Sequence, residues 1–186
     1  MLSRLKGVSR ELQAGEYNFE PGTTPSQMLD KMAKGEAVMH VFTIVEGWTF
    51  RQVLEALNNN SYLTHTFTGL AQAAIMQRIG EDGKAAEGNF APDSYFFSGK
   101  VDDVEILRSA YHLMQKRLMV EWRNRDSQVI YKCPYQALIV ASMIEKETAD
   151  RAEKLLISGV IMRRLQNFLT SLPRTAPLYI PLLRSL

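Results

Sequence analysis

The sequence predicts an α+β fold in which a small strand–helix–strand unit is followed by a mainly helical region. Two observations support this class. Short runs of alternating apolar residues occur near the N-terminus, and capping signals precede several amphipathic runs with helical spacing. The chain has 186 residues, of which 46% are hydrophobic and 23% charged, as in ordinary globular proteins. It can form one domain or two small ones.

Charge and cysteine usage exclude several classes of protein. The formal net charge is +2, with acidic and basic residues interspersed, so nucleic acid is not an expected partner. Cys133 is the only cysteine, which excludes an internal disulfide and argues against a cysteine-rich zinc site. His40, His65 and His112 lack metal-ligand spacing, and a phosphate loop is absent. We therefore expect neither a metal nor a cofactor.

The first 46 residues are predicted to form the strand–helix–strand unit. Residues 12–19 indicate a short strand with a kink at Gly15, and a turn rich in Pro and Gly follows. Thr24 and Gln27 form a capping box for a helix, and Gly35 is suited to end it. Residues 38–44 then alternate as a second strand.

The remaining chain is predicted to be mainly helical. A second capping box, at Thr49 and Gln52, opens a helix that Asn58 to Asn60 end. Residues 83–98 are expected to be loop. Further helices are predicted over residues 69–79, 104–122, 134–147 and 150–165, and the last two should form a hairpin.

Glu145 is the best candidate for acid–base chemistry. It ends a helix whose residues 137–144 are apolar nearly all round, which predicts burial on several sides. Burial would raise the pKa of a carboxyl group, as a proton donor for glycosidic cleavage requires. From spacing alone, a different interpretation is favoured: Glu145 and Glu147 simply solvate a helix end beside Lys146.

Ser142 and Thr148 each lie three residues from Glu145, so they can share its helix face and bind to it or to substrate. Glu147 lies about 200° round the helix from Glu145, so the two carboxylates are not a catalytic pair.

An aromatic segment at residues 90–97 offers a second candidate region. Its aromatic rings are suited to stack on sugar rings, with polar contacts from Asp93 and Ser94. Packing in the core is the favoured interpretation for Phe96 and Phe97, and the role of Asp93 stays open.

Four segments, in order, resemble the YceG-like family of endolytic murein transglycosylases. They are residues 12–19 (LQAGEYNF) with Pro21-Gly22, residues 45–47 (VEG), residues 87–95 (EGNFAPDSY) and residues 141–149 (ASMIEKETA), the last being the most specific. The resemblance covers about residues 8–166. It implies a LysM-like subdomain at 1–46, a partial catalytic domain at 47–166 and a non-matching tail at 167–186.

By this resemblance, Glu145 matches the family's catalytic glutamate. Substrate contacts are predicted from Asp93, Tyr95, Ser142 and Thr148. The implied reaction is cleavage of the β-1,4 bond between N-acetylmuramic acid and N-acetylglucosamine, which leaves a 1,6-anhydro end. One carboxylate suffices because an internal hydroxyl replaces water.

The resemblance also implies partners and a cellular location. The expected partners are peptidoglycan glycan strands and proteins of cell-wall synthesis, at the outer face of the bacterial inner membrane. No apolar run in this chain is long enough to span a membrane, and no signal peptide is recognised, so the chain itself is expected to be soluble, with any anchor encoded upstream. Because the tail departs from the family pattern, a shortened or altered C-terminus is expected to weaken activity.

Two rivals remain. Proteins of this family have also been labelled aminodeoxychorismate lyase-like, which would need pyridoxal phosphate, a Schiff-base lysine and a phosphate cup. Lys146 is the sole lysine in the best motif, and no glycine-rich phosphate loop accompanies it. The other rival is a glycan-binding module without catalysis, which would bind strands without cutting them.

Overall fold

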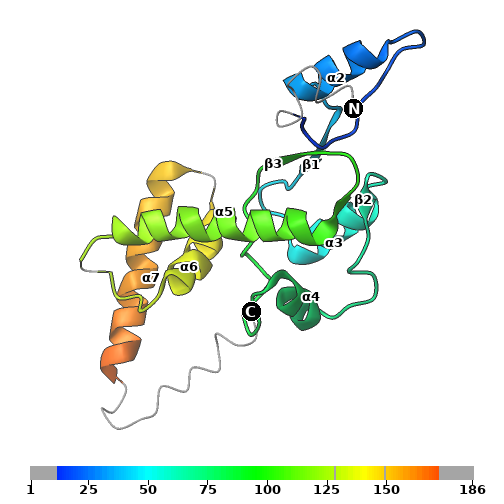
Figure 1. Ribbon diagram of the computed structural model, residues 1–186. Helices are drawn as coiled ribbons and strands as arrows, with labels where there is room; N and C mark the ends of the chain where they lie inside the picture. Colours follow the sequence, from blue (N-terminus) through cyan, green and yellow to red (C-terminus); the bar gives the residue numbers. More distant parts are fainter. Residues whose placement is uncertain (1–11, 128, 149, 172–186) are drawn as a thin grey trace. The chain divides into compact units, whose positions relative to one another are not determined.

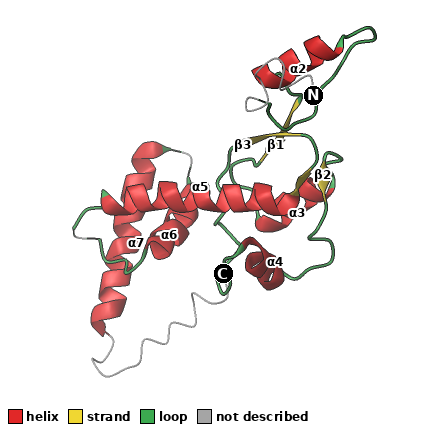
Figure 2. Ribbon diagram, viewed as in Figure 1, coloured by secondary structure: helices red, strands yellow, loops and turns green. Residues whose placement is uncertain are grey.

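The α+β class is confirmed by the computed structural model, which describes residues 12–127, 129–148 and 150–171. Figures 1 and 2 show mostly helix and loop, with a few short strands. In chain order the described elements are α2 (Pro25–Lys34), β1 (Met39–Thr43), α3 (Phe50–Asn58), β2 (Leu63–Thr64), α4 (Gln72–Ile79), β3 (Ser94–Ser98), β4 (Val101–Asp102), α5 (Asp103–Arg123), α6 (Pro134–Glu147) and α7 (Arg151–Ser171).

The chain divides into two compact units, residues 1–117 and 118–186, and each is described separately. The predicted boundary at residue 46 lies inside the first unit, where β1 on one side of it pairs with β3 on the other. The assignment of residues 1–46 to a LysM-like subdomain stays a prediction.

The strand predicted over residues 12–19 does not form. This segment makes single backbone hydrogen bonds instead of a ladder: the Gln13 N–H donates to Met32 O (3.2 Å), and the Val38 N–H donates to Glu16 O (2.7 Å). Gly15 is needed here because a Cβ atom would lie 2.9 Å from the Ala37 Cβ and 2.9 Å from the Ser98 Oγ. The segment therefore runs close against its neighbours without joining a sheet.

Local capping signals are confirmed in the first unit. At α2 and at α3, the N-cap threonine (Thr24 and Thr49) and the glutamine three residues later exchange both hydrogen bonds of a capping box. Gly35 ends α2 in the left-handed conformation, with φ +68°.

Two small two-stranded sheets complete the first unit. β1 pairs antiparallel with β3, with Val41 opposite Phe96 and Thr43 opposite Ser94, and β2 pairs parallel with β4. The loop predicted for residues 83–98 is thus wrong at its end. Its aromatic run alternates in and out, as a strand requires: Tyr95 and Phe97 are buried, whereas Phe96 is exposed.

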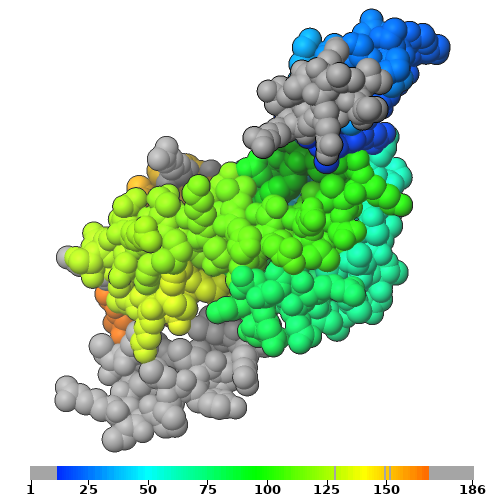
Figure 3. Space-filling view, in the orientation of Figure 1, coloured from blue at the N-terminus to red at the C-terminus, as the bar shows by residue number. Residues whose placement is uncertain are grey.

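The core of the first unit is formed by one side of the β1–β3 sheet, α3, α4 and the first half of α5. Phe50 and Phe90 stack within it at 5.0 Å. The carboxylate of Asp103 is fully buried and accepts hydrogen bonds from the Thr66 N–H (2.8 Å) and the Phe67 N–H (3.3 Å), which ties the start of α5 to the preceding loop. In Figure 3 the cyan and green atoms of this unit form a continuous body.

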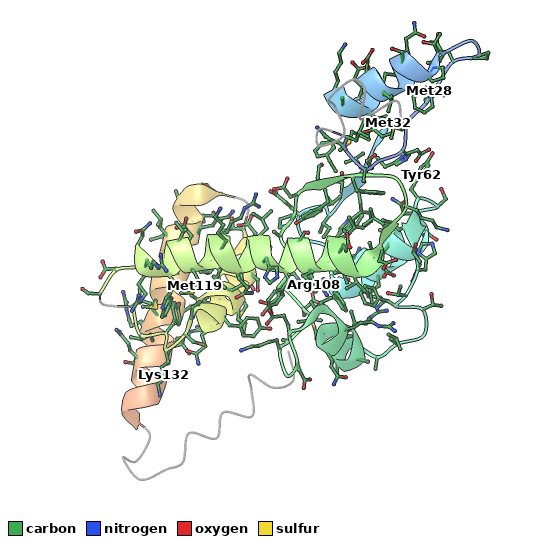
Figure 4. All side chains as sticks on the ribbon, in the orientation of Figure 1. Met28, Met32, Tyr62, Arg108, Met119 and Lys132 are labelled. Atoms are coloured by element: carbon green, nitrogen blue, oxygen red, sulfur yellow. The ribbon has the colours of Figure 1, made fainter. Side chains whose placement is uncertain are left out.

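The second unit contains the predicted hairpin of α6 and α7, which contact each other. Figure 4 labels Met119 on the last turns of α5 and Lys132 in the loop before α6. Pro134 opens α6 as predicted, and the Asp150 carboxylate accepts from the Ala152 N–H (2.9 Å) at the start of α7. No helix in the described ranges has the length and apolar content needed to cross a membrane.

Candidate functional site

Glu145 lies in the last turn of α6, and its surroundings differ from the prediction. Its side chain is 70% exposed, and its Oε2 lies 2.6 Å from the Nζ of Lys154 on α7. The prediction that α6 is buried is therefore wrong. The part of α6 up to Val140 is half-buried, and the turn at Ala141 to Met143 is exposed. An apolar helix is buried all round only where other elements pack against several of its sides, and the described residues do not cover α6 in this way. The low-dielectric environment predicted around Glu145 is therefore missing.

Ser142 and Thr148 have partners other than Glu145. The Ser142 hydroxyl donates to the Ile139 carbonyl in its own helix (2.7 Å), and the Thr148 hydroxyl donates to the Glu153 carboxylate (2.6 Å). The first bond lies within α6. The second joins the residue that follows α6 to the first turn of α7, at the corner of the hairpin. Contact of either hydroxyl with substrate stays a prediction.

Asp93 lies in the first unit, immediately before β3. Its Oδ1 accepts from the Ser94 N–H (2.8 Å), and its Oδ2 lies 2.6 Å from the Nη2 of Arg117 on α5. The Ser94 N–H, and after it the Arg117 guanidinium, lower the pKa of the Asp93 carboxyl. Asp93 is therefore an ionised, oriented acceptor at the edge of the sheet.

Tyr95, also predicted to contact substrate, is buried in the first unit. Its hydroxyl donates to the Ala91 carbonyl (2.6 Å), and burial, followed by the charge of Asp93, raises its pKa to about 12. A substrate contact from this hydroxyl would require the buried side chain to become accessible. The position suits a residue that holds the Asp93 loop in place.

The aromatic segment splits between core and surface. Core packing is confirmed for Phe97, which is 6% exposed, and is wrong for Phe96, which is 68% exposed. Neighbouring residues of a strand point to opposite faces, so the two rings cannot share one environment.

The predicted residues thus form two groups, Asp93 with Tyr95 in the first unit and Ser142, Glu145 and Thr148 in the second. A depression of about 450 Å³ in the first unit, lined by Tyr62 among others, contains none of them. Within the described parts of the chain, no three His, Cys, Asp or Glu residues are grouped closely enough to hold a metal ion.

Sequence reasoning missed Arg117 and Lys154, the two cations that hold the predicted carboxylates. Arg117 is 24 residues from Asp93, and no local pattern connects them. Lys154 was accessible to prediction: in a helical hairpin, the last turn of the first helix lies beside the first turn of the second, which places Lys154 near Glu145.

The chain is similar to one protein family and to several known proteins. A family model described as the YceG-like family matches residues 1–173. Two curated relatives from Streptococcus pneumoniae (strains R6 and D39), each named "Endolytic murein transglycosylase", are 24% identical over 197 residues, which cover 91% of this chain and 35% of the relatives. The chain thus spans about a third of the length of these relatives. A solved structure of a yceG-like protein from Listeria monocytogenes has a TM-score of 0.45 and 16% identity, and the alignment covers 96% of this chain and 67% of that chain.

Proposed function

Because this chain belongs to the YceG-like family, we propose that it takes part in endolytic cleavage of murein glycan strands, with Glu145 as the catalytic acid and base. The observation that supports the proposal most is the family match over residues 1–173, which includes Glu145 and its whole motif. The names of the two curated relatives point to the same activity.

The proposed reaction needs a single carboxyl group. Glu145 gives its proton to the oxygen that joins C1 of N-acetylmuramic acid to N-acetylglucosamine, and that bond breaks. The carboxylate then takes the proton of the muramic acid 6-hydroxyl as its oxygen bonds to C1. The product is a 1,6-anhydro end, and Glu145 regains its proton. The internal hydroxyl gains the advantage of proximity, so no second carboxylate is required.

The exposure of Glu145 conflicts with one requirement of this mechanism. The carboxyl group is accessible to a long glycan strand, but a proton donor at neutral pH needs a drier environment than its 70% exposure provides. We propose that the bound strand itself supplies this environment by covering the hairpin corner, where Ser142 and Thr148 lie near the end of α6.

The test is incubation of purified glycan strands with the parent chain and with Glu145→Gln, followed by mass spectrometry for 1,6-anhydro ends. We expect the parent to produce such ends only weakly, because its last residues depart from the family pattern, and Glu145→Gln to lose at least about 100-fold in rate from that level. Glu147→Gln is the matched control, since this carboxylate is also exposed and lies two residues away, and it should retain its rate within about twofold. Equal yields from Glu145→Gln and the parent would contradict the assignment.

A second function, glycan binding without cleavage, is favoured by one observation: Glu145 is exposed and ion-paired with Lys154. In that case the parent chain binds strands in sedimentation assays but produces no anhydro ends. The two functions are thus separated by one incubation, analysed for both bound and cut material.

For the whole protein we propose action at the outer face of the inner membrane, together with proteins of cell-wall synthesis. The reason is that the printed names of its curated relatives give murein as the substrate. Protease digestion of spheroplasts tests this location. The protein should be degraded without lysis, and protection until lysis would contradict it.

A further inference from the structure

The depression of about 450 Å³ in the first unit lies at the free edge of β1. Residues 39–41 of β1 and residues 59–62, between α3 and β2, line it, and no residue of β3 does. Met39 and Val41 belong to the exposed face of the β1–β3 sheet, whereas His40 belongs to the opposite face. A hollow that is lined by both faces of β1, and not by its partner strand, lies beside β1. We call this depression the edge groove.

The backbone of β1 directs unpaired hydrogen-bonding groups toward this edge. The Ile44 N–H donates to the Asp93 carbonyl (3.0 Å), and this pair continues the β1–β3 register. In an antiparallel ladder, every second residue is hydrogen-bonded to the partner strand, and the residues between them direct their N–H and C=O groups away from it. The backbone groups of Met39, Val41 and Thr43 therefore point to the free edge. Within the described chain, β3 is the only strand that pairs with β1.

This edge lacks the features that commonly prevent strand pairing. Unpaired N–H and C=O groups along an edge are a template for a further strand, and proteins often protect them with proline or charged side chains. The sequence of β1 (MHVFT) contains no Pro, Lys, Arg, Asp or Glu. The free edge of β1 is therefore open to another main chain.

The opposite wall of the edge groove is held in position. The Tyr62 ring stacks on the His40 ring, with centroids 3.8 Å apart, and the His40 Nε2 lies 3.0 Å from the Glu16 Oε2. The Asn60 Oδ1 accepts from the Tyr62 N–H (3.0 Å), and the Asn60 carbonyl accepts from the Leu63 N–H (3.3 Å). The two walls are thus joined by the ring stack, so the groove is formed before a ligand binds.

The chemistry of the edge groove fits an extended peptide. A polypeptide strand repeats its N–H and C=O groups at every second residue, which is the spacing at which Met39 and Val41 present theirs. The side chains of these two residues are 58% and 50% exposed and can contact alternate side chains of an added strand. The lining contains no Asp, Glu, Lys or Arg, which argues against a charged ligand. A glycan has no such regular row of backbone donors and acceptors.

A second copy of the chain fits this edge less well than an isolated segment. If β1 of another copy paired with β1, it would bring its own residues 59–62 to the same place, because these residues lie beside β1 in every copy. Two such loops would then compete for the space beside one pair of strands. An isolated extended segment carries no such loop.

We propose that the edge groove binds an extended, uncharged peptide segment of a partner protein, which pairs with β1 as an added strand. The N–H and C=O groups of Val41, at the centre of β1, bond to the main chain of that segment, and those of Met39 extend the ladder. Residues 59–62 form the other wall of the site. This binding does not depend on the proposed function, because the edge groove and Glu145 lie in different units.

The probe for the test is the blocked peptide acetyl-Thr-Val-Thr-Val-Thr-amide, titrated into the isotope-labelled chain and followed by NMR of the backbone amides. We expect the amide signals of Met39, Val41 and Thr43 to shift most. Those of His40 and Phe42 should shift less, because their N–H groups face β3. The same peptide, N-methylated at its central residues, keeps its side chains but loses main-chain donors, so its Kd should be at least about tenfold higher.

A matched pair of variants tests the same contact from the side of the protein. Val41→Pro removes an N–H group from the free edge and none from the β1–β3 ladder, at a position where a strand tolerates proline. It should raise the Kd of the peptide at least about tenfold, whereas Val41→Ala, which keeps the N–H group, should change it by less than about threefold. Thermal unfolding shows whether both variants fold. If Val41→Pro does not fold, the N-methylated peptide and the amide shifts of the parent decide.

Several results would overturn the proposal. They are no amide shifts with peptide at up to about 1 mM, equal binding of the N-methylated peptide, and an unchanged Kd for a folded Val41→Pro. A dimer in sedimentation velocity that Val41→Pro dissociates, and that the peptide does not, would assign the edge to a second copy of the chain. Shifts of the same amides with the N-acetylglucosamine tetrasaccharide, and none with the peptide, would assign the groove to a glycan.

Discussion

The two units of this chain differ most in how far their helices are buried. In residues 12–117, apolar residues from β1, α3, α4, β3 and α5 form one core, and several side chains, Leu107 and Ile75 among them, are fully buried. Among residues 118–127, 129–148, 150 and 152–167, no side chain is buried, and Leu155 and Leu156 are 76% and 72% exposed. Both units nevertheless form regular helices with recognisable caps.

This difference shows that the formation of a helix and its burial in a core depend on different features of a sequence. Capping and spacing act within a few residues, so they operate equally well in α3 and in α7. Burial needs a second surface, and most helical stability in proteins comes from such packing. We therefore expect the two units to respond very differently to the same substitution.

The largest expected effect is in the core of the first unit. Leu107→Ala removes a side chain with 0% exposure on α5 and should lower the free energy of unfolding by about 2–5 kcal/mol. The matched substitution Leu155→Ala, at 76% exposure on α7, should change it by less than about 0.5 kcal/mol. Urea unfolding followed by circular dichroism measures both. Equal losses would remove the contrast between the units.

A second comparison sets a buried carboxylate against an exposed one. Asp103→Ala leaves the N–H groups of Thr66 and Phe67 without their acceptor and should cost about 1–3 kcal/mol. Lys154→Ala breaks the exposed ion pair with Glu145 and should cost about 1 kcal/mol or less. The same urea experiment measures both losses of unfolding free energy. The loss for Asp103→Ala should be the larger, and the reverse order would contradict the comparison.

Much of the fold could be predicted from local signals. The two threonine capping boxes, Gly35 and Pro134 all mark helix ends where the structure has them, because each acts on backbone groups within one turn. The pairing of β1 with β3 could not be predicted in this way, since the partners are separated by about fifty residues and their register depends on the whole core. The missing strand at 12–19 has the same cause, because a strand exists only with its neighbour.

The candidate site shows the same limit. Glu145 was found through a resemblance in its motif, but its exposure depends on what covers α6, which the helix itself does not encode. Phe96 was assigned to the core with Phe97, although strand alternation separates adjacent residues. Arg117 carried no signal, because its contact with Asp93 joins a helix to a distant turn.

The smallest expected effect concerns pH. Burial raises the pKa of Tyr95 to about 12, above its ordinary value of 10.0, so the neutral phenol contributes to stability below about pH 10 and this contribution is lost as pH rises toward 12. Between about pH 9 and about pH 11, the parent should therefore lose more unfolding free energy than Tyr95→Phe. Tyr131→Phe is the comparison in the second unit. Burial also raises the pKa of Tyr131, but this side chain is only half-buried, so the substitution should change the pH dependence less.

Hydrogen exchange of the intact chain, read by mass spectrometry of peptides, compares the two units directly. Amide protons of α3, α4 and the first half of α5 should be protected to near the global free energy of unfolding, whereas those of α6 and α7 should exchange much faster, because their helices open without breaking a core. Protection of α6 and α7 equal to that of α3 would contradict this account of the molecule.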